Sequence, residues 1–396
     1  MPLSDYIVIG AGLAGAAAAW QLAERGHNVT VVERTTPAND EGSSHGSARI
    51  FRYAYPSQLY TDLVVRARSG WDALERAAGK HLITPTGAID FGAVRQPELL
   101  ARVLERAGVE HELLAAADAR ARFPQFNFDT EVLYHPGSGV LDAITTVETM
   151  LDLAVATGRV DLRTNWEVAG ITRTAFGGFV VKSATGERVA GAKVIVAAGG
   201  WFPHLLQDLA LPSAFLESFP KLEVRQEQAF HMPWREQDAS GNTYPSWPTF
   251  IHKRFEFETY GLPGGRDAEF RGQKLAQFNG GPVIPSALDQ DGRIRPEMRA
   301  KMIAYAEEFL PGVVPEPYAE TTCLFTNTQN EDFVIDEADG VVVVSACSGH
   351  GGKFAPLLGE LAADLATGTG TVPQEFRVAQ NQFKDYGTGP FGREAV

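Results

Sequence analysis

The chain has 396 residues, of which 44% are hydrophobic and 21% charged, the composition of an ordinary soluble globular protein with room for two or three domains. Its 35 lysine and arginine residues against 49 aspartate and glutamate residues give a net charge of −14, which argues against binding to a nucleic-acid backbone. The two cysteines, Cys323 and Cys347, are too few for a disulfide framework or a cysteine-built zinc site, and they suit a reducing compartment.

The first apolar stretch, from Tyr6 to Leu22, looks like the core of a signal peptide, but its flanks do not fit one. Asp5 stands where a signal peptide carries basic residues, and no lysine or arginine precedes it. No other stretch is long and apolar enough to span a bilayer. We therefore expect a cytoplasmic protein that does not contact a membrane.

The same stretch is better explained as the start of a βαβ unit. The apolar run 6–9 predicts a strand, and the glycine-rich turn 10–15 leads into a helix expected over 16–25. A second apolar strand is expected over 29–32, and it ends at Glu33. Strand, turn, helix, strand and acid in this order are typical of a dinucleotide-binding fold.

Each glycine of this turn has a physical role. Gly10 permits the tight turn, Gly12 lets the backbone approach a pyrophosphate, and Gly15 lets the helix pack close to the strand. The helix N-terminus offers unpaired N–H groups to phosphates. Glu33 stands where an acid would accept hydrogen bonds from ribose hydroxyls, and an acid here argues against a 2′-phosphate. The pattern does not distinguish FAD from NAD.

Further along the chain, hydrophobic periodicity predicts both helices and strands. Helices are expected over 59–78, 97–107, 115–123, 141–157, 296–309 and 356–367. Strands are expected over 86–92, 168–181 (a pair), 193–200, 222–230, 249–257, 274–278 and 341–344. The apolar runs 193–200 and 341–344 fit a return to a buried parallel sheet. The nine histidines are scattered without ligand spacing, so we expect no metal site.

These elements predict a discontinuous nucleotide-binding domain. It takes residues 1–85, 140–220 and 320–396, and a substrate domain formed by 86–139 and 221–319 is inserted between them. The fold class is therefore α/β.

Several short motifs, in one order along nearly the whole chain, resemble those of a known family. They are Gly10-x-Gly12-x-x-Gly15 with Glu33, Ser43-Ser-His-Gly-x-x-Arg49-x-x-Arg52, Ala197-Ala-Gly-Gly-Trp201, Arg225-Gln226, Thr322-Cys323-x-x-Thr326, Phe333-x-Ile335-Asp336 and Ser348-Gly-His-Gly-x-Lys353. The sequence resembles the monomeric sarcosine oxidase and N-methyltryptophan oxidase group of the D-amino-acid-oxidase-like FAD-dependent oxidoreductases. The resemblance implies a Rossmann-like FAD-binding domain of the glutathione-reductase type and an inserted antiparallel-sheet substrate domain.

The resemblance also implies FAD rather than NAD, and a covalent flavin. Cys323 occupies the family position whose sulfur is joined to the 8α carbon of the flavin ring, whereas Cys347 is assigned no role. Without the resemblance, Cys323 would be interpreted as a small buried core residue. The cofactor-binding residues implied are Gly10, Gly12, Leu13, Ala14, Gly15, Glu33, Arg34, Ser43, Ser44, His45, Arg49, Val168, Ala198, Gly199, Trp201, Cys323, Gly349, Gly351, Gly352 and Lys353.

Five further roles follow from the resemblance. Arg52 and Lys353 match the pair that binds the substrate carboxylate, a guanidinium bidentately and an ammonium as a point charge. Lys274 matches the lysine that activates oxygen over the flavin, where a fixed positive charge favours superoxide formation. Arg49 is expected beside the flavin ring, and Tyr260 matches an active-site tyrosine.

Two positions depart from the family pattern. Phe278 stands where the family commonly has a histidine, and Phe325 where a tyrosine is common. Both are expected to line the substrate pocket and to make it drier. A larger or cyclic secondary amine with apolar bulk is therefore expected to fit better than sarcosine.

The implied function is an FAD-dependent oxidase of a secondary or N-alkyl amino acid. Hydride passes from the C–H bond next to nitrogen to flavin N5, an imine forms, and O2 is reduced to hydrogen peroxide. The alternatives are an FAD-dependent amine or amino-acid dehydrogenase with another electron acceptor, and a non-catalytic flavin-binding protein. The expected partners are a small amine with a carboxylate and O2, without nucleic acid or membrane, and the expected state is a monomer or small homo-oligomer.

Overall fold

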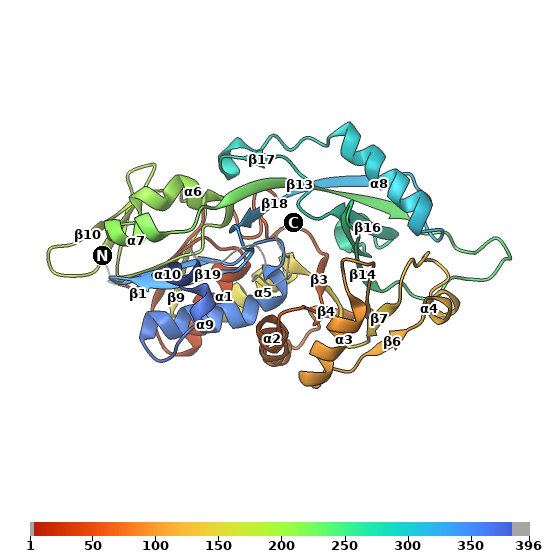
Figure 1. The fold of residues 1–396 in the computed structure, drawn as a ribbon. Helices are drawn as coiled ribbons and strands as arrows, with labels where there is room; N and C mark the ends of the chain where they lie inside the picture. The colour runs from red at the N-terminus through yellow and green to blue at the C-terminus, as the bar shows by residue number, and fades with distance from the viewer. Residues whose placement is uncertain (1–3, 382–396) are drawn as a thin grey trace.

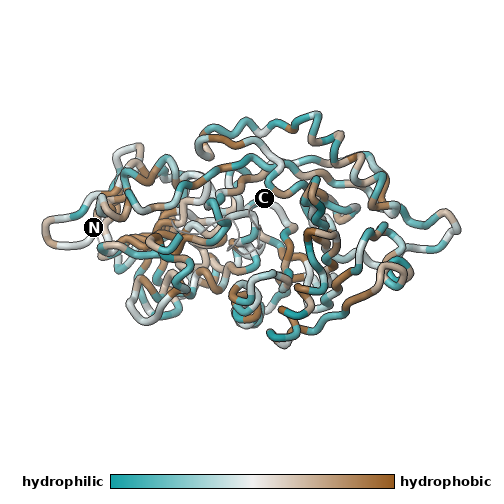
Figure 2. Tube along the Cα trace, in the orientation of Figure 1, coloured by the Kyte–Doolittle hydropathy of each residue, from teal (hydrophilic) through white to brown (hydrophobic). Residues whose placement is uncertain are grey.

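The structure, a computed structural model, describes residues 4–381. Figure 1 shows two lobes: an α/β lobe that contains β1 (Ser4–Ile9) and α1 (Leu13–Glu24), and a second lobe around the sheet that contains β13 (Glu223–Pro233) and β14 (Thr249–Lys253). Figure 2 shows hydrophobic stretches within the helices and strands of both lobes. No helix among the described residues is long and apolar enough to cross a bilayer.

The α/β lobe is built on an eight-stranded sheet. Its main path is β10 (Val168–Arg173), β11 (Phe179–Ser183), β12 (Arg188–Val196), β1, β2 (Val29–Val32) and β9 (Val160–Arg163), and β20 (Val341–Ser345) pairs with both β12 and β19 (Val334–Ala338). β1 runs parallel to β2 and β12, and β12 runs parallel to β20. These pairings confirm the parallel sheet expected from the sequence.

Helices and loops cover both faces of this sheet. Val8 contributes to the core formed with α1, α5 (Ala143–Ala156) and α9 (Ala355–Thr367), whereas Ile7 contributes to the core on the other face. Successive side chains of a strand point to opposite faces, so a strand covered on both faces is apolar throughout. This explains the unbroken apolar run that begins the chain.

The turn after β1 is as tight as the glycines predicted. Gly10 has a φ of +94°, and a Cβ on it would lie 2.5 Å from the carbonyl oxygen of Ala197. A Cβ on Gly15 would lie 1.8 Å from the carbonyl oxygen of Gly10. α1 begins at Leu13, earlier than the sequence predicted, because its first turn is part of the glycine turn itself with Gly12 at the N-cap.

The second lobe is built on a nine-stranded sheet. Its main path is β17 (Val283–Ile284), β13, β16 (Gly272–Gln277), β15 (Glu258–Pro263), β14, β5 (Ala88–Phe91), β7 (Val132–His135) and β6 (Glu112–Leu114), and β18 (Ala319–Asn327) pairs with β13. The sheet is antiparallel as expected, except that β14 and β5 run parallel. β18 belongs to this sheet, so the expected domain boundary at 320 falls inside one of its strands.

The remaining elements surround the two main sheets. They are the three-stranded sheet of β3 (Arg49–Phe51), β8 (Gly139–Leu141) and β4 (Ile83–Pro85), and the helices α2 (Gln58–Ala78), α3 (Pro97–Arg106), α4 (Ala116–Arg122), α6 (Phe202–Leu205), α7 (Ser213–Ser218), α8 (Pro296–Phe309) and α10 (Val378–Asn381).

Candidate active site

Two adjoining cavities lie where the lobes meet the glycine turn. The first has a volume of about 200 Å³, is partly open to solvent, and lies between the N-terminus of α1 and the strands β14, β15, β16 and β18. The second, of about 130 Å³, lies along β1, β2 and the segment after β12. They share the lining residues Gly12, Ser43, Ser44, Ala197 and Gly199. Together they form an elongated space.

Most residues that the sequence predicted at a site line this space. The first cavity is lined by Gly12, Leu13, Ala14, Ser43, Ser44, Arg49, Arg52, Gly199, Tyr260, Lys274, Phe278, Cys323, Phe325, Gly349, Gly351, Gly352 and Lys353. The second is also lined by Gly10, Glu33, Arg34, Val168, Ala198 and Trp201. Gly15 and His45 line neither cavity. Gly15 packs under the turn, and His45 is buried, with a pKa that burial lowers to about 3.

The second cavity has an acid where the sequence predicted one. One carboxylate oxygen of Glu33 accepts the Ala11 N–H at 2.7 Å, and the other accepts the Thr35 N–H at 3.2 Å. Ser44 Oγ accepts the Leu13 N–H at 3.0 Å, at the start of α1. Two backbone N–H groups thus orient the Glu33 carboxylate, and its remaining lone pairs can accept hydroxyl groups.

Cys323 lies on β18 and lines the first cavity, together with two cations. Burial raises the pKa of its thiol, and the nearby Arg49 and Lys274 only partly offset this. The Arg49 guanidinium donates to three backbone carbonyls, those of Ala48, His45 and Ser43. Cys347 lines the same cavity.

Lys274 lies on β16 and its side chain is almost fully buried, with only 4% of the residue exposed. Burial and the neighbouring Arg49 lower the pKa of Lys274 to about 8. Tyr260, on β15, lines the same cavity, and burial raises its pKa well above the ordinary value. The catalytic residues suggested by the sequence are therefore brought to one cavity from β3, β15 and β16.

Arg52 and Lys353, far apart in the sequence, come together around a tyrosine that the sequence analysis missed. The Arg52 guanidinium lies 4.3 Å from the centre of the Tyr55 ring. Lys353 Nζ donates to the Tyr55 hydroxyl at 3.0 Å and to the His350 carbonyl at 2.6 Å. Both cations are 4% exposed and line the first cavity. Burial and the adjacent Arg52 lower the pKa of Lys353 well below the ordinary value.

His350 orients Tyr55. Its Nε2 lies 3.0 Å from the Glu331 carbonyl and its Nδ1 lies 3.0 Å from the Tyr55 hydroxyl. A carbonyl only accepts, so Nε2 carries the proton and Nδ1 accepts from Tyr55. Burial keeps the ring neutral by lowering the pKa of His350 well below the ordinary value. The Tyr55 oxygen is then free to accept from Lys353.

The sequence analysis also missed a charged pair on the cavity wall. Lys253 Nζ lies 2.7 Å from a carboxylate oxygen of Glu258, on the neighbouring strand, and 5.4 Å from the centre of the Phe278 ring. Both members of the pair line the first cavity beside Phe278 and Phe325. The cavity wall is therefore more polar than Phe278 and Phe325 alone suggested. No motif in the sequence marks Lys253 or Glu258.

Comparison with known proteins shows a match along nearly the whole chain. A family model described as "DAO: FAD dependent oxidoreductase" matches residues 5–365. The chain is 30% identical over 374 residues to monomeric sarcosine oxidase of Bacillus sp. (strain B-0618), covering 91% of this chain and 92% of that protein. It is 31% identical over 373 residues to N-methyl-L-tryptophan oxidase of Yersinia pestis (strain Pestoides F), covering 91% and 94%.

A solved structure shows the same architecture. The open form of NikD, described as an unusual amino acid oxidase essential for nikkomycin biosynthesis, superposes with a TM-score of 0.80 at 25% identity, over 95% of this chain and 96% of that chain. The family match covers more than half of the chain, and two curated relatives align along nearly its whole length. The chain therefore belongs to the DAO family of FAD-dependent oxidoreductases, as the motifs of its sequence had indicated.

Proposed function

We propose that this protein is an FAD-dependent oxidase of a secondary or N-alkyl amino acid. The observation that carries the proposal is the single cavity that brings the Arg52 and Lys353 cations together with Lys274 and Cys323. The names of the two relatives described above give sarcosine and N-methyl-L-tryptophan as their substrates. Each of these two substrates is an amine with a carboxylate.

The residues present fit FAD. The two cavities share the helix N-terminus at Gly12, where the backbone N–H groups of the first helical turn and a partial positive charge favour a pyrophosphate. A side chain at position 12 would bring its Cβ to 2.8 Å from Ser44 Oγ, so this position favours glycine. Because glycine has no side chain, the backbone there is open to the close approach of a ligand. Glu33 would bind the ribose hydroxyls in the second cavity. The ring system would lie in the first cavity, where Cys323 would form the covalent link.

The chain's own residues then bind and orient the amine. Arg52 and Lys353 bind the carboxylate in a buried site, where charge-assisted hydrogen bonds are strong. Phe278 and Phe325 exclude water from the apolar part of the substrate, and the Lys253–Glu258 pair offers a polar contact beside them. The chemistry that bound FAD would supply is acceptance of the hydride from the C–H bond beside nitrogen, and its reoxidation by O2 would give hydrogen peroxide.

Lys274 favours an oxidase over a dehydrogenase. Its ammonium lines the cavity that would contain the ring, and a fixed cation there stabilises the negative charge that oxygen gains. A dehydrogenase with another electron acceptor remains the alternative. The yield of peroxide relative to reduction of an artificial dye distinguishes the two.

The test is a flavin-bleaching screen with the purified yellow protein. We expect N-methyl and cyclic secondary amino acids to bleach the flavin without oxygen and to release peroxide when air is admitted. The matching amines without a carboxylate should bleach it far more slowly, because Arg52 and Lys353 then have no anion to bind. If none of these carboxylated amines bleaches the flavin, the proposed function is wrong.

A further inference from the structure

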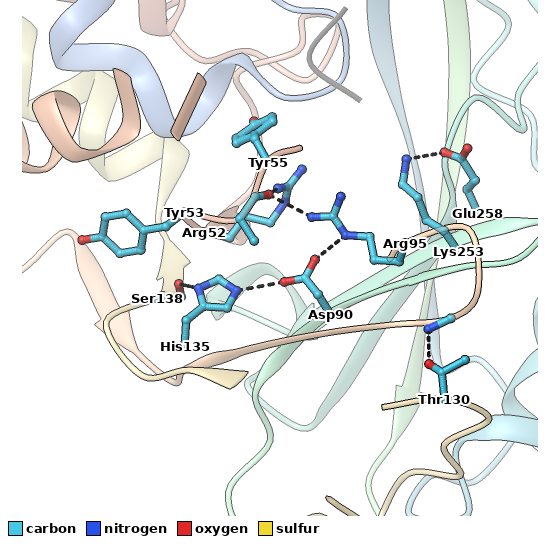
Figure 3. Close-up of polar contacts among 12 residues, drawn as sticks. Arg52, Tyr53, Tyr55, Asp90, Arg95, Thr130, His135, Ser138, Lys253 and Glu258 are labelled. Atoms are coloured by element: carbon cyan, nitrogen blue, oxygen red, sulfur yellow. Dashed lines mark hydrogen bonds and ion pairs between the residues drawn. The ribbon is translucent and has the colours of Figure 1, made fainter. Parts of the chain in front are cut away.

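A buried polar network lies directly behind Arg52. Arg52 lines the first cavity, whereas the other residues of the network line neither cavity. Figure 3 shows it as a chain of side chains that leads from Ser138 through His135, Asp90 and Arg95 to the segment that carries Arg52. Asp90 lies on β5 and His135 at the end of β7, both in the second lobe, whereas Arg52 directly follows β3. The network therefore joins the sheet of one lobe to the substrate anchor.

Every link of this network is a short polar contact. Ser138 Oγ lies 2.6 Å from His135 Nδ1, and His135 Nε2 lies 2.9 Å from one carboxylate oxygen of Asp90. The other Asp90 oxygen accepts from Arg95 Nε at 2.6 Å. Arg95 Nη2 donates to the Ala54 carbonyl at 2.9 Å, and Arg52 Nη1 donates to the same carbonyl.

The protonation states along the network follow from burial and charge. Burial would raise the pKa of Asp90, but Arg95 and the hydrogen bond from His135 outweigh it and lower that pKa below the ordinary range. Burial lowers the pKa of His135, so the ring is neutral. A carboxylate only accepts, so His135 donates from Nε2 to Asp90 and accepts from Ser138 at Nδ1.

Ser138, His135 and Asp90 have the order of a hydrolytic triad, but all three are 0% exposed. No substrate reaches the serine, and the Asp90 carboxylate is shared with Arg95. The arrangement is therefore a support for Arg95, which in turn lies beside Arg52.

Asp90 also supplies the negative charge that two adjacent guanidinium groups need. Arg95 lowers the pKa of Arg52, after the larger effect of burial, and Asp90 acts in the opposite direction. Two buried guanidinium groups that share one carbonyl acceptor repel each other, and a nearby carboxylate offsets this repulsion. Without Asp90, the Arg52–Arg95 arrangement would lose its counter-charge.

We propose that Asp90 and Arg95, supported by His135 and Ser138, are positioning residues that fix the Arg52 guanidinium for binding of the substrate carboxylate. This inference rests on the proposed function, because it assumes that Arg52 binds that carboxylate. It predicts that residues which touch neither cofactor nor substrate set the affinity for the anionic end of the substrate.

The experiment measures binding of propionate to the purified holoenzyme through the change in flavin absorbance, with propionamide as the uncharged control. Asp90→Asn keeps the shape and removes the charge, and we expect the Kd for propionate to rise about tenfold or more while that for propionamide changes little. Arg95→Met should act in the same way, and Arg95→Lys should recover part of the affinity. The KM for an amino acid that the enzyme oxidises should rise by a larger factor than kcat falls.

A matched variant controls for loss of stability. Asp129→Asn likewise removes the charge of a carboxylate, here one that contacts the buried His252 on β14 of the same sheet, and should leave the propionate Kd within twofold of the unmodified protein. If Asp90→Asn does not fold, the comparison of Arg95→Met with Arg95→Lys carries the same test.

Two outcomes overturn the inference, and they are distinguishable. If Arg52→Gln abolishes propionate binding but Asp90→Asn and Arg95→Met do not weaken it, Arg52 binds the carboxylate and the positioning role is wrong. If Arg52→Gln itself leaves propionate binding unchanged, the carboxylate anchor is wrong, and the proposed function fails with it.

Discussion

Replacement of Lys274 by methionine should separate function from stability at a single buried position. Lys274 is 4% exposed and lines the cavity that would contain the flavin ring. Removing one preorganised charge from an active site costs about 10²–10³ in rate. We expect Lys274→Met to slow reoxidation of the reduced enzyme by O2 by about that factor, while reduction of the flavin by the amine changes little.

The same substitution should stabilise the fold. Burial and Arg49 lower the pKa of Lys274 from the ordinary 10.5 to about 8, which corresponds to a cost of ~3 kcal/mol for keeping the side chain charged. Between pH 8 and 10.5 the unfolded chain binds more protons than the folded protein, so the stability of the unmodified protein rises with pH over this window. The gain from Lys274→Met is therefore largest below pH 8 and disappears above 10.5.

Stopped-flow reoxidation and denaturant unfolding at pH 7 and pH 10 measure these two effects separately. Lys182→Met, at an exposed position of β11, is the matched control and should change neither. An unchanged oxygen rate would refute the role of Lys274. A variant that is less stable at pH 7 than the unmodified protein would refute the argument from burial.

Three other experiments test other parts of the site. Cys323→Ala should release the yellow colour into the supernatant after acid precipitation, whereas Cys347→Ala should leave it with the pellet; a yellow supernatant from the unmodified protein would refute the covalent link. Gly15→Ala should abolish FAD binding, measured by flavin content, because its Cβ would lie 1.8 Å from a backbone oxygen. Lys253→Met should lower the free energy of unfolding more than the double variant with Glu258→Met does, because the single change removes the cation that lies 2.7 Å from the half-buried Glu258 carboxylate; equal losses in urea unfolding would contradict this.

The N-terminal βαβ unit was predictable because its signals are local. An apolar strand, a turn whose glycines admit no Cβ, and an alanine-rich helix are each encoded within a few residues. The helix start was misplaced by three residues: Gly15 was interpreted as part of the turn, although it lies in the first turn of α1. The parallel β5–β14 pair was not predictable, because the register of strands distant in sequence depends on the packing of the whole sheet.

The substrate end of the cavity was predictable only through its resemblance to a family. Arg52 and Lys353 stand in recognisable motifs, but their contact through Tyr55 follows from folding. Nothing in the sequence around Tyr55 distinguishes it from an ordinary core tyrosine, because a buried hydroxyl is identified by its partners, and these come from other segments. The same is true of Lys253, whose partner Glu258 is visible only once the β14–β15 hairpin is formed.

The network behind Arg52 shows why such sites are assembled from separated segments. Asp90 is buried on a strand whose pattern predicts apolar neighbours, and a buried carboxylate is stable there only because Arg95 and His135 supply donors from a loop and from the next strand. Because the cost of burying a charge is offset only when all partners are in place, the network forms only with the complete fold. A guanidinium held in this way has fewer orientations to lose when a carboxylate binds, and this gives a buried arginine its affinity.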